Sequence, residues 1–100
     1  MVIDLKAISV EFIEGVYLGS KNYRGKGSKF PLIKIFLWSA GEKQPVEILA
    51  DRARWAEQGG DQLKINKQKI SISVGIYSIL QKGKEFMIHV FEDILNVSDV

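Results

Sequence analysis

The sequence contains no cysteine, two prolines and one histidine. Because thiols are absent, disulfide scaffolds and thiolate metal sites are excluded, and the cytoplasm is the expected compartment. Long apolar runs are also missing: a stretch such as Ile70–Leu80 is interrupted by serine and glycine, and none approaches the roughly 18 to 20 apolar residues that cross a bilayer. Met1–Asp4 shows no basic region followed by an apolar run, so neither a secretory signal nor a membrane association is expected.

Motifs of catalysis and of cofactor binding are scarce as well. The single histidine, His89, lies between two apolar residues of an alternating segment, where a histidine is more often structural or superficial than a catalytic base. Glu92 and Asp93 are adjacent, so on a strand they point to opposite faces and form a poor cation chelate. Gly25–Ser28 lacks the spacing and the following helix of a phosphate-binding loop. We therefore expect no enzymatic activity, no cofactor and no metal.

What is present describes one globular domain. Of the 100 residues, 46% are hydrophobic and 26% are charged, a balance typical of soluble folds. A chain of this length buries about 60 to 70% of the surface that it exposes when unfolded, which allows one core. Residues 1–100 are therefore expected to form a single domain, and any functional site must lie on the face of that one fold.

The net charge of +2 hides two strongly basic segments. Gly15–Gly41 (the first basic block) and Gln62–Lys84 (the second basic block) each contain five cations and no acidic residue. The cations are Lys21, Arg24, Lys26, Lys29 and Lys34 in the first block and Lys64, Lys67, Lys69, Lys82 and Lys84 in the second. If the two blocks converge in space, they form a site for a polyanion such as a nucleic acid. The alternative is that these lysines solvate exposed strands and protect sheet edges.

Apolar residues that alternate with polar ones dominate the chain and predict strands. Gly15–Gly19 should break or bend the first strand, and Gly75 should mark a bulge or bend in the fourth. Phe91–Val97 either extends the last strand or folds against the barrel. The expected strands are Val2–Phe12, Phe30–Ser39, Pro45–Ala50, Lys69–Leu80 and Glu85–Val90.

One short helix is expected between the third and fourth strands. Asp51 can cap its start, good helix formers continue to Gln58, and Gly59–Gly60 supplies a left-handed stop. Three strands, a short helix and two more strands is the order of an OB-type barrel. The expected fold is therefore all-β with one short helix, a five-stranded OB-like Greek-key barrel whose end Trp55 plugs. An SH3-like barrel is the main structural alternative.

Aromatic residues accompany the first basic block. Leu18–Lys29 contains three glycines, four cations and Tyr23, which predicts an exposed wing whose cations reach phosphates while the ring stacks on a base. The second expected strand has a core face of Ile33, Ile35 and Leu37 and an opposite face of Leu32, Lys34, Phe36 and Trp38. The alternative is that Phe36 and Trp38 belong to a two-sided core. Phe86 is expected to be buried.

A family resemblance points the same way. Arg24-Gly25-Lys26, Phe30, Leu32, Trp38, Gly41 and Pro45-Val46 resemble the basic wing and following strands of the filamentous-phage helix-destabilising proteins, small dimeric OB-fold binders of single-stranded DNA. Gly75-Ile76-Tyr77 and Phe86-Met87-Ile88 are similar to later parts of that family, so that the resemblance covers about half of the chain. It implies that Arg24, Lys26, Phe30 and Trp38 contact DNA. The Pro45–Gly75 interval is longer here, with the expected helix in it, and the hairpin between Gly75 and Phe86 is shorter.

The sequence therefore predicts a sequence-nonspecific, non-catalytic single-stranded DNA-binding protein of replication or phage/plasmid type. RNA is a further candidate ligand, and a homo-oligomer such as a dimer is expected. The alternative is a protein-interaction or assembly barrel whose sheet edges pair with a partner. The expected nucleic-acid-binding residues are Lys21, Tyr23, Arg24, Lys26, Lys29, Phe30, Lys34, Phe36, Trp38, Lys82 and Lys84.

Overall fold

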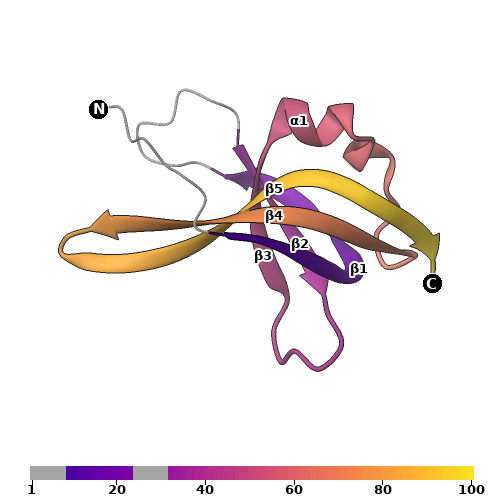
Figure 1. The fold of residues 1–100 in the computed structure, drawn as a ribbon. Helices are drawn as coiled ribbons and strands as arrows, with labels where there is room; N and C mark the ends of the chain where they lie inside the picture. Colours follow the sequence, from indigo (N-terminus) through magenta and orange to yellow (C-terminus); the bar gives the residue numbers. More distant parts are fainter. Residues whose placement is uncertain (1–8, 24–31) are drawn as a thin grey trace.

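Five strands and one short helix form the fold in a computed structural model that describes residues 9–23 and 32–100 (Figure 1). The strands close into a ring in the order β1-β2-β3-β5-β4. Neighbouring strands are antiparallel except for the parallel pair β3 and β5. This order, with the helix between β3 and β4, confirms the predicted OB-like Greek-key barrel. The elements are β1 (Ser9–Tyr23), β2 (Leu32–Trp38), β3 (Val46–Asp51), α1 (Arg52–Glu57), the short 3-10 helix η1 (Gly60–Gln62), β4 (Gln68–Gln81) and β5 (Lys84–Asp99).

The first strand is longer than predicted because the glycine-rich segment bends it without ending it. Its first half pairs with β4 and its second half with β2. The register slips between Tyr17 and Gly19, which leaves Leu18 as an extra residue in a bulge. Beyond the bulge, Lys21 and Tyr23 lie opposite outward residues of β2 and therefore share its outer face. Residues 18–23, the described part of the segment that was predicted to be an exposed wing, therefore belong to strand β1.

The core lies inside the ring and is closed at one end by α1. Trp55 is fully buried, and its ring centre lies 5.9 Å from that of Tyr17 and 4.9 Å from that of Phe91. The prediction that Trp55 plugs the barrel is therefore confirmed. Gly60 packs so closely on the indole that a Cβ atom there would lie 2.1 Å from the ring. The inward residues of β2 are Ile33, Ile35 and Leu37, all buried as predicted.

The helix begins and ends where the sequence indicates. The Asp51 side chain accepts a hydrogen bond from the Arg54 backbone amide (3.1 Å), and Gly59 adopts a left-handed conformation at the end. Arg54 then fixes the helix to the sheet, because its Nε donates to the Glu92 carbonyl oxygen (3.0 Å) and its guanidinium pairs with Asp93. In the described part of the chain, no helix has the length and apolar character needed to traverse a membrane.

A long hairpin of β4 and β5 extends beyond the ring, at the left of Figure 1. Ser9, the first described residue of β1, lies opposite Ile76, so the described part of β1 does not flank the hairpin beyond that point. We call its outer part, Tyr77–Ile88, the hairpin arm. Phe86, which lies in this arm, was expected to be buried, but it is 46% exposed. That prediction is wrong because the arm has no second layer among the described residues to cover the ring.

Candidate nucleic-acid interface

The outer surface of three adjacent strands combines cations with rings. Residues directly opposite one another in neighbouring antiparallel strands share a face. Lys21, Lys34 and Leu49 therefore form one row across β1, β2 and β3, and the pair Phe36 and Glu47 lies in the next row. We call this surface the outer β1–β2–β3 face. Its members used below are Lys21 and Tyr23 of β1, Lys34 and Phe36 of β2, and Glu47 and Leu49 of β3.

Two lysines lie over two rings on this face. The Lys21 ammonium is 5.4 Å from the centre of the Phe36 ring, and the Lys34 ammonium is 5.3 Å from the centre of the Tyr23 ring. Both distances fall within the roughly 6 Å over which a cation is attracted to a ring face. Each pair sets a phosphate-binding group beside a flat surface on which a base can stack. Phe36 is half-buried and Tyr23 is exposed.

One carboxylate interrupts the basic character of the face. Glu47 Oε2 lies 3.4 Å from the Lys34 ammonium, and both side chains are partly exposed to water. Ion pairs in such surroundings contribute about 1 kcal/mol or less. A phosphate group can therefore compete with Glu47 for Lys34 at small cost, although the carboxylate weakens the local positive potential.

A cleft opens beside this face between β3 and the hairpin arm. In the described residues, β3 and β5 are joined through one residue pair, Leu49 and Val90, and the two strands diverge from it. The cleft has a volume of about 240 Å³, which is below the range of pockets that enclose drug-sized ligands, about 300 to 1,000 Å³. It therefore suits a group smaller than a drug-sized ligand. The lining residues are Tyr23, Lys34, Glu47, Ile48, Leu49, Met87, Ile88 and His89.

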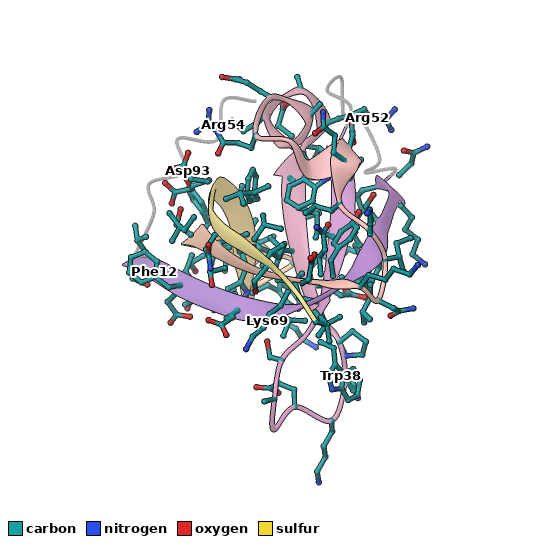
Figure 2. All side chains as sticks on the ribbon, turned by 90° about the vertical axis from the view of Figure 1, so that its right-hand side faces the viewer. Phe12, Trp38, Arg52, Arg54, Lys69 and Asp93 are labelled. Carbon is teal, nitrogen blue, oxygen red and sulfur yellow. The ribbon has the colours of Figure 1, made fainter. Side chains whose placement is uncertain are left out.

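Trp38 lies apart from this cleft. It follows Lys34 by four residues, which places it about 13 Å farther along β2. Its side chain is 43% exposed and lines a separate hollow with Glu14 and Lys69. In Figure 2 the Trp38 side chain lies beside the β2–β3 connection. Trp38 is thus an exposed residue of β2 and not part of a second core.

The same hollow contains an ion pair. The Lys69 ammonium is 2.6 Å from the Glu14 carboxylate, and this contact, together with the Ser71 hydroxyl, holds the pKa of Glu14 below its ordinary value.

The second basic block is divided between the two ends of β4. Lys82 and Lys84 lie at the tip of the hairpin arm, whereas Lys69 lies at the start of β4, and Lys64 and Lys67 precede it. Lys84 is three residues from Met87 of the cleft, a distance of about 10 Å along the strand. The structure therefore separates the two parts of the second block: Lys82 and Lys84 lie at the tip of an arm that projects away from the ring, and the other three lysines lie at the opposite end of β4.

Sequence reasoning selected Tyr23 and Lys34 but missed the other six residues that line the cleft, among them Glu47, Met87 and His89. Some other predicted site residues lie outside the described ranges. Glu47, Met87 and His89 line the cleft because β3 and β5 diverge, and no local pattern signals how far two distant strands stay paired. Within residues 9–23 and 32–100, no cluster of three or more metal-binding side chains occurs. The predicted site residues that fall outside the described ranges are Arg24, Lys26, Lys29 and Phe30.

The chain matches no described protein family, and no characterised protein sequence matches it. The resemblance to the filamentous-phage helix-destabilising proteins therefore stays a prediction.

Proposed function

We propose that the protein binds single-stranded DNA without sequence preference and without catalysis, as a cytoplasmic replication or phage/plasmid protein. The observation that supports this most directly is the pair of lysine-over-ring contacts on the outer β1–β2–β3 face, Lys21 over Phe36 and Lys34 over Tyr23. Cations that neutralise phosphates and rings that stack on any base are the two elements of sequence-tolerant single-strand binding. Single-stranded RNA offers the same groups and is a further ligand for the test.

The bound DNA strand would run across the outer β1–β2–β3 face toward the hairpin arm. Lys21 and Lys34 bind successive phosphates, and the rings beside them accept the bases. The cleft between β3 and β5 is lined by Tyr23 and Lys34, so a base stacked on the Tyr23 ring would have this recess next to it. Lys82 and Lys84 at the tip of the arm extend the contact beyond the ring of strands.

The experiment is a fluorescence titration with oligo-dT over a series of salt concentrations. Contacts from Lys21, Lys34, Lys82 and Lys84 neutralise about four phosphates, so the log–log slope of affinity against salt should be near −3, at about −0.7 per phosphate. A matched duplex serves as the competitor and should bind more weakly, because its bases are already stacked. A slope near zero, or equal affinity for the duplex, contradicts the proposal.

A protein-interaction module is the second candidate, and the hairpin arm supports it. Leu80 is 78% exposed and Met87 and Phe86 are also exposed, which is a large apolar area for the tip of a hairpin. A pull-down that keeps its protein partner after nuclease treatment and in high salt would favour this function. Loss of every partner under both treatments would favour the nucleic acid.

A further inference from the structure

The hollow beside Trp38 places an exposed ring next to an ion pair. Val16 lies opposite Lys69 of β4 and opposite Trp38 of β2, so these three residues form one row across the outside of the ring of strands (Figure 2 labels Lys69 and Trp38). Glu14 precedes Val16 by two residues and therefore points to the same face of β1. The hollow has a volume of about 610 Å³, within the roughly 300 to 1,000 Å³ of pockets that hold small ligands.

The backbone around this hollow fixes the positions of its side chains. The Ser39 hydroxyl, just beyond the end of β2, donates to the Glu14 carbonyl oxygen at 2.7 Å. A Cβ atom at Gly15 would lie 2.8 Å from the Trp38 carbonyl oxygen, so a glycine is needed for the two strands to approach this closely. The ring and the carboxylate are therefore carried by strands that are joined next to the hollow, which is the arrangement that holds a binding site most precisely.

The ion pair presents its hydrogen-bonding groups in a defined order. Lys69 Nζ lies 2.6 Å from Glu14 Oε1, and the Ser71 hydroxyl donates to Glu14 Oε2 at 3.2 Å. A carboxylate offers about four lone pairs, so each oxygen can accept one further hydrogen bond, and the ammonium keeps further N–H donors. The low pKa of Glu14 maintains the accepting, ionised form at neutral pH. The groups that remain for a ligand are therefore a donor, an acceptor and a second acceptor, in that order.

We propose that this hollow is a guanine-selective base site, in which the base stacks on Trp38 and its Watson–Crick edge binds Lys69 and Glu14. That edge of guanine carries O6, N1–H and N2–H, which is the order acceptor, donor, donor. It therefore complements the Lys69 ammonium and the two Glu14 oxygens one by one. The other bases match at most two of the three groups, because none of them carries an acceptor followed by two donors. Stacking on a ring accepts every base, so the selectivity comes from the edge.

The guanine can belong to a DNA strand or to a free nucleotide, because both offer the same base. Only the first source rests on the proposed single-strand binding. In that case the preference concerns the one nucleotide at Trp38, and the contacts of Lys21 and Lys34 with the rest of the strand stay independent of sequence.

Titration with mononucleotides, followed by NMR spectroscopy of the isotope-labelled chain, tests the site without any DNA. GMP should bind about tenfold or more tightly than AMP, CMP or UMP, since a bidentate base contact discriminates by about that factor. IMP, which lacks only the 2-amino group of GMP, should bind with an affinity between those of GMP and AMP. The indole signal of the exposed Trp38 should shift, while that of the buried Trp55 should not. Equal affinities for GMP and AMP, or an unshifted Trp38 signal, overturn the proposal.

Two variants separate the edge contact from stacking. Glu14→Gln keeps the size of an exposed side chain but replaces one acceptor by a donor, so the affinity for GMP should fall to that for AMP. Glu11→Gln is the matched control, because Glu11 lies on the same strand, points to the opposite face and does not line the hollow. Trp38→Ala should weaken the binding of all four mononucleotides. An unchanged preference for GMP in Glu14→Gln, or equal losses in Glu14→Gln and Glu11→Gln, contradicts the proposal.

Oligonucleotides distinguish the two sources of the base. One guanine at the end of an oligo-dT strand that reaches Trp38 should raise the affinity about tenfold, and one at the other end should not. Selective binding of GMP without a gain at either end assigns the hollow to a free nucleotide. Failure of oligo-dT to bind would refute the proposed function, but the selectivity among mononucleotides would be measured all the same, so the two proposals fail separately.

Discussion

The Lys34 ammonium lies 5.3 Å from the centre of the Tyr23 ring, across two neighbouring strands. If this pair binds one nucleotide, Tyr23→Ala should lower the affinity for oligo-dT by about 1 to 3 kcal/mol, the usual value of a base stacked on a ring. Tyr23→Phe keeps the ring and should retain most of the affinity, which a fluorescence titration measures. A loss in Tyr23→Phe as large as in Tyr23→Ala would mean that the hydroxyl, and not stacking, binds the ligand.

Substitution of Trp38 tests how far a bound oligonucleotide extends along β2. Because its side chain is exposed and separated from the Tyr23 cleft, Trp38→Ala should fold normally, as circular dichroism reports. Its affinity should fall by about 1 to 3 kcal/mol for an oligonucleotide long enough to follow β2, and should not change for one that covers the cleft alone. Loss of the native spectrum would instead assign Trp38 to the core.

The two ends of β4 offer a matched test of the basic blocks. The double variant Lys82→Ala and Lys84→Ala should reduce the magnitude of the salt slope by about 1.4, since each phosphate contact contributes about 0.7. The control is Lys64→Ala with Lys67→Ala, which removes the same charge from the opposite end of β4 and should leave the slope unchanged. Equal reductions in both double variants would show that net charge, and not the hairpin arm, determines binding.

Gly60 is expected to be essential for packing. A methyl group at this position would lie 2.1 Å from the Trp55 ring, which is fully buried and has no space to move into. Gly60→Ala should therefore lower the free energy of unfolding by about 1 to 3 kcal/mol or more. Gly59→Asn is the control: no atom lies within 4 Å of the added Cβ, and asparagine tolerates the left-handed backbone there. Urea denaturation compares the two variants, and equal stabilities would contradict the packing argument.

The Glu14–Lys69 pair predicts a pH dependence of stability. Lys69 and Ser71 hold the pKa of Glu14 below its ordinary value, so the ionised carboxylate stabilises the fold above the ordinary pKa of about 4.3. This contribution is lost as the pH falls through the lowered pKa. Glu14→Gln should therefore have a lower Tm than the native chain at pH 7, and the two Tm values should converge once the pH has fallen below the lowered pKa of Glu14. A constant difference at all pH values would assign the effect to packing.

The sequence predicts the local features of this fold better than the distant ones. Alternation in β2 separates the buried Ile35 from the outward Lys34, and Asp51 caps the helix, because both effects depend on residues near in the chain. A break or bend was predicted within Gly15–Gly19, but not the bulge at Leu18 that determines that Lys21 faces outward. The exposure of Phe86 was also missed, because the reach of β1 along β4 depends on three-dimensional pairing that no local period encodes.

The same contrast between local and distant features holds for the candidate site. The outward side chains of β2 were predicted from the alternation of residues along the strand. The cleft was not predicted, because it depends on where two strands that are distant in sequence separate. Lys82 and Lys64 belong to one acid-free segment of sequence, yet the length of β4 lies between them. Charge patterning alone therefore overstates how many of these lysines reach one ligand.

The single pair Leu49 and Val90 joins β3 to β5 in the described residues, and its position has a mechanical consequence. The hairpin arm projects from this point with its lysines at the far end, so a force applied at the tip acts through a long lever on one narrow seam. The cleft beside Tyr23 borders the same seam, so the ring of strands closes at the place where the arm is attached.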